Sequence, residues 1–343
     1  MFRIRFPAML TGAVLCTGLL WGAQVAANGY GDHPAAQQFI ADMAKEGFDE
    51  GEVRTVLGAA ERQESILKAI SRPAEKRLNW GEYRNIFLRD TRINQGVEFW
   101  NEYSDTLQRA EETYGVPAQI IVAIIGVETR YGRNMGSYRV VDSLSTLGFD
   151  YPPRGKFFQG QLKEYFYLLK EERVDPLSLK GSYAGAMGFG QFIPSSFRSF
   201  AVDFDGDGRK DIWTNPVDAI GSVANYFRAH GWKTGEPVRS NVVIEQLAEE
   251  ALINGDLKPE LTLAQWSERG IRTHKGLDAE SKATLMRMET DGAFQHWFGL
   301  HNFYVITRYN HSRLYAMAVY ELSQAVAEKR QQALAEKTTG VAG

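Results

Sequence analysis

A single carboxylate at the end of an apolar segment is the best candidate for chemistry in this sequence. Residues 117–132 read PAQIIVAIIGVETRYG, and Glu128 follows a run of Ile, Val and Ala side chains. Apolar surroundings and the negative end of a helix both disfavour a charged carboxylate, so we expect a raised pKa. A carboxylic acid that keeps its proton near neutral pH can act as a general acid. The alternative is a structural glutamate paired with Arg130 or Arg133, and this segment alone favours neither.

An acidic loop is the second candidate, in this case for a metal ion. The segment DFDGDGRKDIW has oxygen donors at the spacing of an EF-hand-like loop, with the seventh position contributing its backbone carbonyl. Hard oxygen ligands at this spacing predict Ca²⁺. The residues at positions one, three, five, seven and nine are Asp203, Asp205, Asp207, Arg209 and Asp211.

The loop departs from the usual pattern at its twelfth position, where Thr214 replaces the bidentate Glu. Asp218 is the nearest later carboxylate and a candidate ligand. It also has a structural explanation, because Asn215 and Pro216 could begin a helix in which Asp218 is the capping partner. Both interpretations of Asp218 stay open.

A glycine-rich segment, GSYAGAMGFGQFIPSSF at residues 181–197, could bring the backbone close to a ligand. It lacks the Gly-Lys-Ser/Thr ending of a nucleotide phosphate loop. Ser182 and Gln191 are the polar side chains that it could present. A tight packing turn is the alternative.

The elements that must position these residues are mostly helical. Residue 117 suits the first turn of a central helix, and the apolar residues after it leave no broad polar face. Short amphipathic helices are expected before it, from about residue 34 to 108, with Tyr83 in an aromatic segment that could contact a ligand or the core. Residues 129–158 are expected to be irregular and to border a cleft.

The character changes between residues 233 and 300. VRSNVVI, ATLMRME and AFQHWFG alternate like strands around a short helical piece, TLAQWSERG. The prediction is an α+β, mostly helical fold. Its parts are 28–108, an N-terminal helical lobe; 109–232, the core with the calcium loop; 233–300, a small β-containing lobe; and 301–343, a segment that returns to the core.

Composition excludes several classes of protein. The chain has 343 residues, of which 44% are hydrophobic, so it can bury a large core. Residues 1–27 carry Arg3 and Arg5 and then an apolar stretch, as a secretory signal does, and they include the only cysteine, Cys16. Removal of this leader, which has no acidic residue, lowers the formal net charge from −3 to −5. Nucleic acid is therefore not an expected partner, and no other stretch is long and apolar enough to span a membrane.

Four segments of the chain, taken in order, closely resemble the lytic transglycosylase B family of bacterial peptidoglycan enzymes. They are GVETRYG, the glycine-rich segment, the acidic loop with PVDAIGSVANYFRAHGW, and TRYNHSRLYAMAV. The resemblance covers most of the chain after residue 27. It implies a lysozyme-like core that cleaves the β-1,4 bond between N-acetylmuramic acid and N-acetylglucosamine. In this family the C6 hydroxyl of the sugar closes on C1 and leaves a 1,6-anhydro product.

The resemblance also implies roles for individual residues. Glu128 matches the catalytic acid and base. Phe157 stands where the family pattern has a tyrosine, and the calcium loop has one extra residue before Pro216. The residues that fall on sugar-binding positions are Ser182, Gln191, Tyr309, Asn310, Tyr83, Tyr226, Tyr315 and Arg154.

The resemblance further implies peptidoglycan glycan strands as the binding partner and cell-wall synthesis proteins as the class of further partners. Family members are lipoproteins or soluble, and Leu15 before Cys16 favours a soluble periplasmic enzyme, expected to be a monomer. Ca²⁺ is the expected cofactor, with a structural role.

The chemistry also stands without the resemblance. Glycosidases normally use two carboxylates, and no second one adjoins Glu128 in sequence, although Asp142 and Asp150 stay candidates. One carboxylate is enough where the nucleophile belongs to the substrate. The alternatives are a lysozyme-type muramidase that uses water and a non-catalytic, calcium-dependent wall-binding protein.

Overall fold

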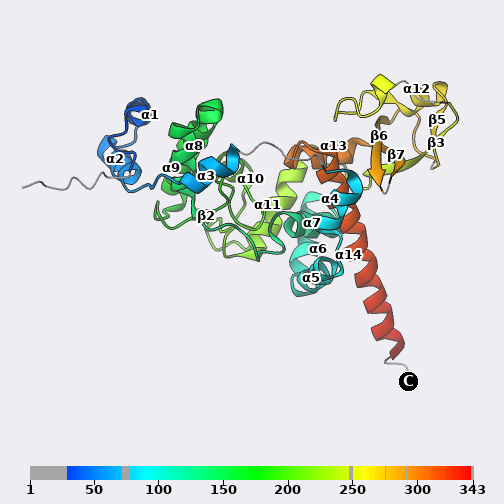
Figure 1. Cartoon of the computed structure of the whole chain (residues 1–343). Helices are drawn as coiled ribbons and strands as arrows, with labels where there is room; N and C mark the ends of the chain where they lie inside the picture. Colours follow the sequence, from blue (N-terminus) through cyan, green and yellow to red (C-terminus); the bar gives the residue numbers. More distant parts are fainter. Residues whose placement is uncertain (1–28, 72–77, 247–249, 275, 291, 341–343) are drawn as a thin grey trace, which may run out of the picture.

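The computed structural model describes residues 29–71, 78–246, 250–274, 276–290 and 292–340. The expected leader, residues 1–27 with Cys16, lies outside the described residues. Within them the chain is mostly helical with a small antiparallel sheet, which confirms the predicted fold class (Figure 1).

The helices are α1 (Pro34–Lys45), α2 (Glu50–Gly58), α3 (Glu64–Ile70), α4 (Trp80–Phe87), α5 (Asp90–Glu102), α6 (Ser104–Tyr114), α7 (Ala118–Thr129), α8 (Val140–Asp150), α9 (Gly155–Glu172), α10 (Pro194–Phe200), α11 (Pro216–Ala229), α12 (Leu263–Glu268), α13 (His301–Tyr309) and α14 (Arg313–Gly340), with 3-10 turns η1 (Pro152–Arg154) and η2 (Glu250–Leu252). The strands are β1 (Tyr138–Arg139), β2 (Lys180–Gly181), β3 (Arg239–Ile244), β4 (Leu261–Thr262), β5 (Ile271–Thr273), β6 (Lys282–Thr290) and β7 (Ala293–Gly299).

Helix α7 is the centre of the largest hydrophobic core. Its residues from Ile120 to Gly126 are all buried, as the apolar sequence predicts. Helices α5, α6, α11 and α14 pack against it (Figure 1). A helix that is apolar on every side is stable only when other elements surround it, which is what this packing provides.

A second core lies beside the first and joins helices that are distant in sequence. It contains α1–α3, α8, α9 and α10, and the glycine-rich segment contributes Met187 and Phe192. Tyr309, at the end of α13, packs against both cores. The predicted irregular segment 129–158 was wrong in part, because Val140–Asp150 forms the helix α8, whose residues are almost all buried. Its mixed polar sequence hid a helix that tertiary contacts stabilise.

The β lobe is attached through the two faces of one strand. The strand order is β4-β6-β7-β3-β5, and every pairing is antiparallel. Along β6, Ala283 and Leu285 face the lobe's own core with α12, whereas Met286 and Met288 belong to the α7 core. Successive side chains of a strand point to opposite faces, so one strand joins both cores. The predicted strands and the short helix between them are confirmed.

A glycine in α7 is required by a close contact with Tyr131. A Cβ on Gly126 would lie 2.6 Å from the Tyr131 hydroxyl oxygen. Tyr131 is buried and has a left-handed backbone with φ of 60°, so its ring has little freedom to move. The close approach of these two residues fixes the chain just beyond Glu128.

We predict that Gly126→Ala lowers the free energy of unfolding by about 1–3 kcal/mol, because overpacking outweighs the gain in helix propensity. Gly160→Ala in α9 is the matched control, since nothing lies within 4 Å of its Cβ position. We expect this control to gain about 0.5–1 kcal/mol. Urea denaturation measures both, and a Gly126→Ala variant as stable as the control would contradict this account of the contact.

Candidate active site

Glu128 lies in the last turn of α7, where the chain leaves the helix abruptly. The residue as a whole is half-buried, and its carboxyl group is the buried part. Arg130 and Tyr131 follow with φ of 56° and 60°, a left-handed conformation that non-glycine residues rarely adopt. The side chains of Arg130 and Arg133 turn away from Glu128. Arg130 donates to Gln95, and Arg133 lies 3.8 Å from the carboxylate of Glu98. The expected alternative, an ion pair to Glu128, is therefore not formed.

The protonation of Glu128 is governed by its burial. Burial raises its pKa to about 7, and a hydrogen bond from the Tyr315 hydroxyl opposes part of this rise. That hydrogen bond joins Tyr315 Oη to Glu128 Oε1 at 2.5 Å. The predicted upward shift is confirmed. With a pKa near neutrality, the same carboxyl can donate a proton and then accept one.

Three tyrosines from three helices surround this carboxyl. The negative charge of Glu128 adds to burial in raising the pKa of Tyr83, Tyr309 and Tyr315. They come from α4, the end of α13 and the start of α14, so the site forms only when these helices pack around α7. Tyr226 stands behind Tyr309, with ring centroids 4.7 Å apart.

The hydroxyls of Tyr309 and Tyr226 donate hydrogen bonds to backbone carbonyls near the site. Tyr309 donates to the carbonyl of Gly190 at 2.5 Å, and Tyr226 donates to the carbonyl of Arg308 at 2.7 Å. Gly190 itself cannot carry a side chain, since a Cβ would lie 2.8 Å from the Tyr309 hydroxyl oxygen. The glycine-rich segment is thereby fixed against the end of α13.

Thr129, the residue after Glu128, connects the end of α7 to the glycine-rich segment, and no motif in the sequence marks it. Its hydroxyl donates to the carbonyl of Phe189 at 2.9 Å and accepts the amide of Gly132 at 3.0 Å. A buried threonine directly after a candidate acid is a weak signal by itself. Its role depends on a partner 60 residues away.

Hydrogen bonds to the backbone fix the orientation of the two polar side chains of the glycine-rich segment, Ser182 and Gln191. Gln191 has φ of 51°, and its amide nitrogen donates to the carbonyls of Met135 and Gly188. The Ser182 hydroxyl accepts the amides of Ala184 and Ala186. Both side chains therefore keep one hydrogen-bonding function for another molecule, the carbonyl oxygen of Gln191 and the hydroxyl hydrogen of Ser182.

The remaining expected sugar contacts lie at the surface. Asn310 is exposed directly after Tyr309. Arg154, in η1, is exposed and lies over the rings of Phe157 and Phe158. In the described residues, no contact of Arg154 with Glu128 or its tyrosines is formed.

The two other candidate carboxylates are engaged elsewhere. Asp142 accepts the amide of Glu61 and pairs with Arg139 at 2.7 Å. Asp150 accepts the Tyr30 hydroxyl and pairs with Arg62. Both hold the N-terminal helices against α8, so Glu128 is left as the one candidate carboxyl among the three.

Two carboxylates of the acidic loop lie close to the carboxylate of Asp218 in α11. Oxygens of Asp203, Asp205 and Asp218 lie within 4.8 Å of one another, a spacing that one ion with ligands at 2.3–2.6 Å could bridge. Asp218 is fully buried and accepts the amides of Phe204 and Asp211. Asn215 caps α11 as expected, but Asp218 bonds back to the loop rather than acting as the capping partner.

The other two carboxylates of the loop bond to the backbone. Asp207 accepts the amide of Arg209 at 2.9 Å. Asp211 accepts the amides of Trp213 and Thr214 at 2.9 and 2.8 Å. These hydrogen bonds fix the backbone of the loop at Asp207–Arg209 and at Asp211–Thr214.

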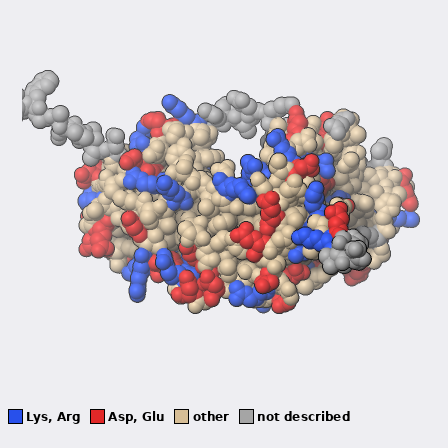
Figure 2. Space-filling view, turned by 90° about the horizontal axis from the view of Figure 1, so that it is seen from below, with Lys and Arg blue, Asp and Glu red and all other residues tan. Residues whose placement is uncertain are grey.

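The surface around these elements carries both signs of charge. Figure 2 shows acidic and basic side chains interspersed over one face of the molecule, separated by wide uncharged areas. The described residues of this face therefore do not produce a long-range field of one sign.

The mostly helical fold and the Glu128 carboxyl, which keeps its proton up to about pH 7, are features of an enzyme that uses a general acid. The Transglycosylase SLT domain matches residues 31–324, so the chain belongs to this family of transglycosylases. Membrane-bound lytic murein transglycosylase B of Escherichia coli K12 is 46% identical over 88% of this chain and 85% of its own length.

Solved structures give the same result. Lytic transglycosylase SltB1 from Pseudomonas aeruginosa is 54% identical, with a TM-score of 0.85 over 88% of this chain and 99% of its own. The E. coli lytic transglycosylase Slt35 in complex with calcium is 44% identical, with a TM-score of 0.80 over 90% and 98%. P. aeruginosa SltB3 in complex with NAG-anhNAM-pentapeptide is 30% identical, with a TM-score of 0.75 over 84% and 78%. The resemblance seen in the sequence is confirmed.

We predict that Glu128→Gln stabilises the fold at high pH. The folded chain holds the Glu128 proton up to about pH 7, whereas the unperturbed group loses it near 4.5. The folded state binds more protons in this window, so stability falls as the pH rises through it. Glutamine avoids that loss and still accepts from Tyr315. Urea unfolding should show a gain of about 1–3 kcal/mol at pH 8 and almost none at pH 4; a pH-independent difference would contradict the burial of the charge.

Proposed function

We propose that this lytic transglycosylase cleaves the β-1,4 bond between N-acetylmuramic acid and N-acetylglucosamine with Glu128 as its only acid and base. The observation that carries the proposal is a carboxyl with a pKa near 7, bonded to Tyr315 and without a carboxylate partner among the described candidates. A two-carboxylate glycosidase would need a second acid close to the first.

The reaction proceeds in two proton transfers. Glu128 protonates the glycosidic oxygen as the bond from C1 of the muramic acid breaks, and the N-acetyl group of the substrate stabilises the positive charge at C1. The C6 hydroxyl then attacks C1 and gives its proton to the Glu128 carboxylate. No water is consumed, and Glu128 returns to its protonated form with a 1,6-anhydro ring as the product.

The surrounding residues bind and orient the sugars. Tyr83, Tyr309 and Tyr315 offer aromatic surface beside Glu128, with Tyr226 packed behind Tyr309. Ser182 and Gln191 offer the free hydrogen-bonding functions described above. Asn310 extends the polar lining at the end of α13. Arg154 would contact a more distant sugar, since it lies at the surface of η1.

The acidic loop fits a structural Ca²⁺ ion. Asp203, Asp205 and Asp218 would hold it, with the Arg209 carbonyl, Asp207 and Asp211 completing an oxygen shell of the size that Ca²⁺ takes. Such an ion would tie the start of α11 to the loop after α10. The likeness to a calcium-bound relative supports this assignment.

The place of action is proposed from the sequence. Residues 1–27 would direct secretion to the periplasm, where the chain would act as a monomer on peptidoglycan beside cell-wall synthesis proteins. None of the helices in the described part of the chain has the length and apolar character needed to cross a membrane.

Analysis of the products tests the reaction. Digestion of purified peptidoglycan should yield muropeptides lighter by one water than their hydrolytic counterparts, as mass spectrometry detects. Glu128→Gln should lower the rate at least about a hundredfold, while Glu112→Gln on the surface of α6 leaves it unchanged. Hydrated products alone would establish the muramidase alternative, and a fully active Glu128→Gln enzyme would overturn the assignment of the acid.

Thermal unfolding tests the ion. At a hundredfold excess over its Kd, Ca²⁺ should stabilise the fold by about 2.7 kcal/mol, and chelation should reverse the rise in Tm. Asp205→Asn should reduce this rise. Asp32→Asn, which removes the same charge from a fully exposed side chain, should not. A Tm that does not respond to Ca²⁺ would exclude the site.

A further inference from the structure

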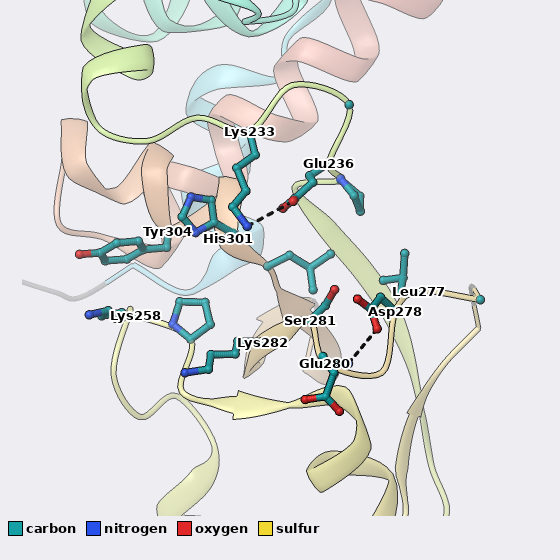
Figure 3. Close-up of a pocket in the computed structure, with 15 residues that line it drawn as sticks. Lys233, Glu236, Lys258, Leu277, Asp278, Glu280, Ser281, Lys282, His301 and Tyr304 are labelled. Atoms are coloured by element: carbon teal, nitrogen blue, oxygen red, sulfur yellow. Dashed lines mark hydrogen bonds and ion pairs between the residues drawn. The ribbon is translucent and has the colours of Figure 1, made fainter.

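A cavity of about 680 Å³ lies apart from Glu128, where α13 meets the β lobe. Figure 3 shows it between the start of α13, the turn before β3, and the chain before and at the start of β6. His301 and Tyr304 line it from the helix, and Lys258 and Lys282 line it from the lobe. The residues that surround Glu128 do not line it, so it is a separate cavity.

The charges of this cavity are separated between its walls. The ammonium groups of Lys258 and Lys282 and the Tyr304 ring lie on one side, while Asp278 and Glu280 lie on the other (Figure 3). Lys233 pairs with Glu236 at 3.2 Å. Among the described residues, neither Lys258 nor Lys282 has an acidic partner, although three carboxylates line the same cavity.

Helix α13 connects this cavity to the candidate acid. Tyr304 lines the cavity. Tyr309 follows five residues later on the same helix and is close enough to Glu128 for the negative charge of Glu128 to raise its pKa. A helix rises about 1.5 Å per residue, so the two tyrosines are separated by about 7.5 Å along its axis. An extended peptide of five residues spans up to about 17 Å. Five residues are about 1.4 turns of a helix, so the two tyrosines lie on different sides of α13. A peptide attached to a sugar near Glu128 would have to pass around the helix to enter the cavity.

We propose that this cavity binds the peptide carried by the glycan strand, with a peptide carboxylate held between Lys258 and Lys282. The inference rests on the proposed function and adds to it a site for the non-sugar part of the substrate. A free amine of the peptide would face Asp278 and Glu280. Neutral sugars require no unpaired ammonium groups, and the acidic wall would repel a polyphosphate, so a peptide with both charges fits best.

Binding of a free peptide tests this site without any cleavage. A synthetic pentapeptide with free carboxylates and one free amine should bind the full chain in titration calorimetry. Lys258→Glu with Lys282→Glu should raise its Kd about tenfold, the effect of losing two partly exposed ion pairs. Lys68→Glu with Lys329→Glu, exposed lysines outside the cavity, changes the net charge equally and should leave the Kd unchanged. Equal Kd values for the two double variants would overturn the inference.

Cleavage of two substrates separates this inference from the proposed function. On peptide-bearing glycan strands the Lys258→Glu, Lys282→Glu enzyme should show a KM raised about tenfold, with little change in kcat. On strands from which the peptides have been removed it should match the wild type. A wild type that cleaves neither substrate would refute the proposed function and leave the peptide titration as the test of the site. An equal loss on both substrates would refute the peptide site.

Discussion

The burial of one carboxyl group at the end of α7 is the constraint on which the rest of the site depends. Glu128 sits at the boundary of the largest core, and its pKa lies near 7 because water is largely excluded around it. The Tyr315 hydroxyl is its hydrogen-bonding partner, and the neighbouring arginines pair elsewhere. A counter-ion in contact would have favoured the charged form and removed the proton that the proposed general acid needs.

Keeping that carboxyl in place requires a backbone that few sequences could adopt. The chain leaves α7 through two left-handed residues, Arg130 and Tyr131, and the Tyr131 ring packs on Gly126 of the helix it has just left. Thr129 then ties this turn to the glycine-rich segment, which Tyr309 holds from the other side. Such strain persists only where surrounding contacts determine the conformation, as the two cores do here.

Each of the three hydrophobic cores holds a different part of the molecule in place. Helix α7 of the first core carries the candidate acid, the second core includes residues of the glycine-rich segment, and β6 joins the β lobe to the first core through side chains on its two faces. The cavity lined by Lys258 and Lys282 lies where the lobe meets α13, and the acidic loop lies before α11.

Local patterns in the sequence were enough to predict the central helix, its terminal glutamate, the strands of the β lobe and the cap of α11, because each depends on residues close together in the chain. The sequence also predicted the upward pKa shift, since an apolar helix has to be buried. Tertiary structure decided the rest. It turned Arg130 and Arg133 away from Glu128, engaged Asp142 and Asp150 with the N-terminal helices, folded α8 and directed Asp218 into the acidic loop. These outcomes depend on partners far away in sequence, and no local spacing encodes which of several possible partners a side chain will meet.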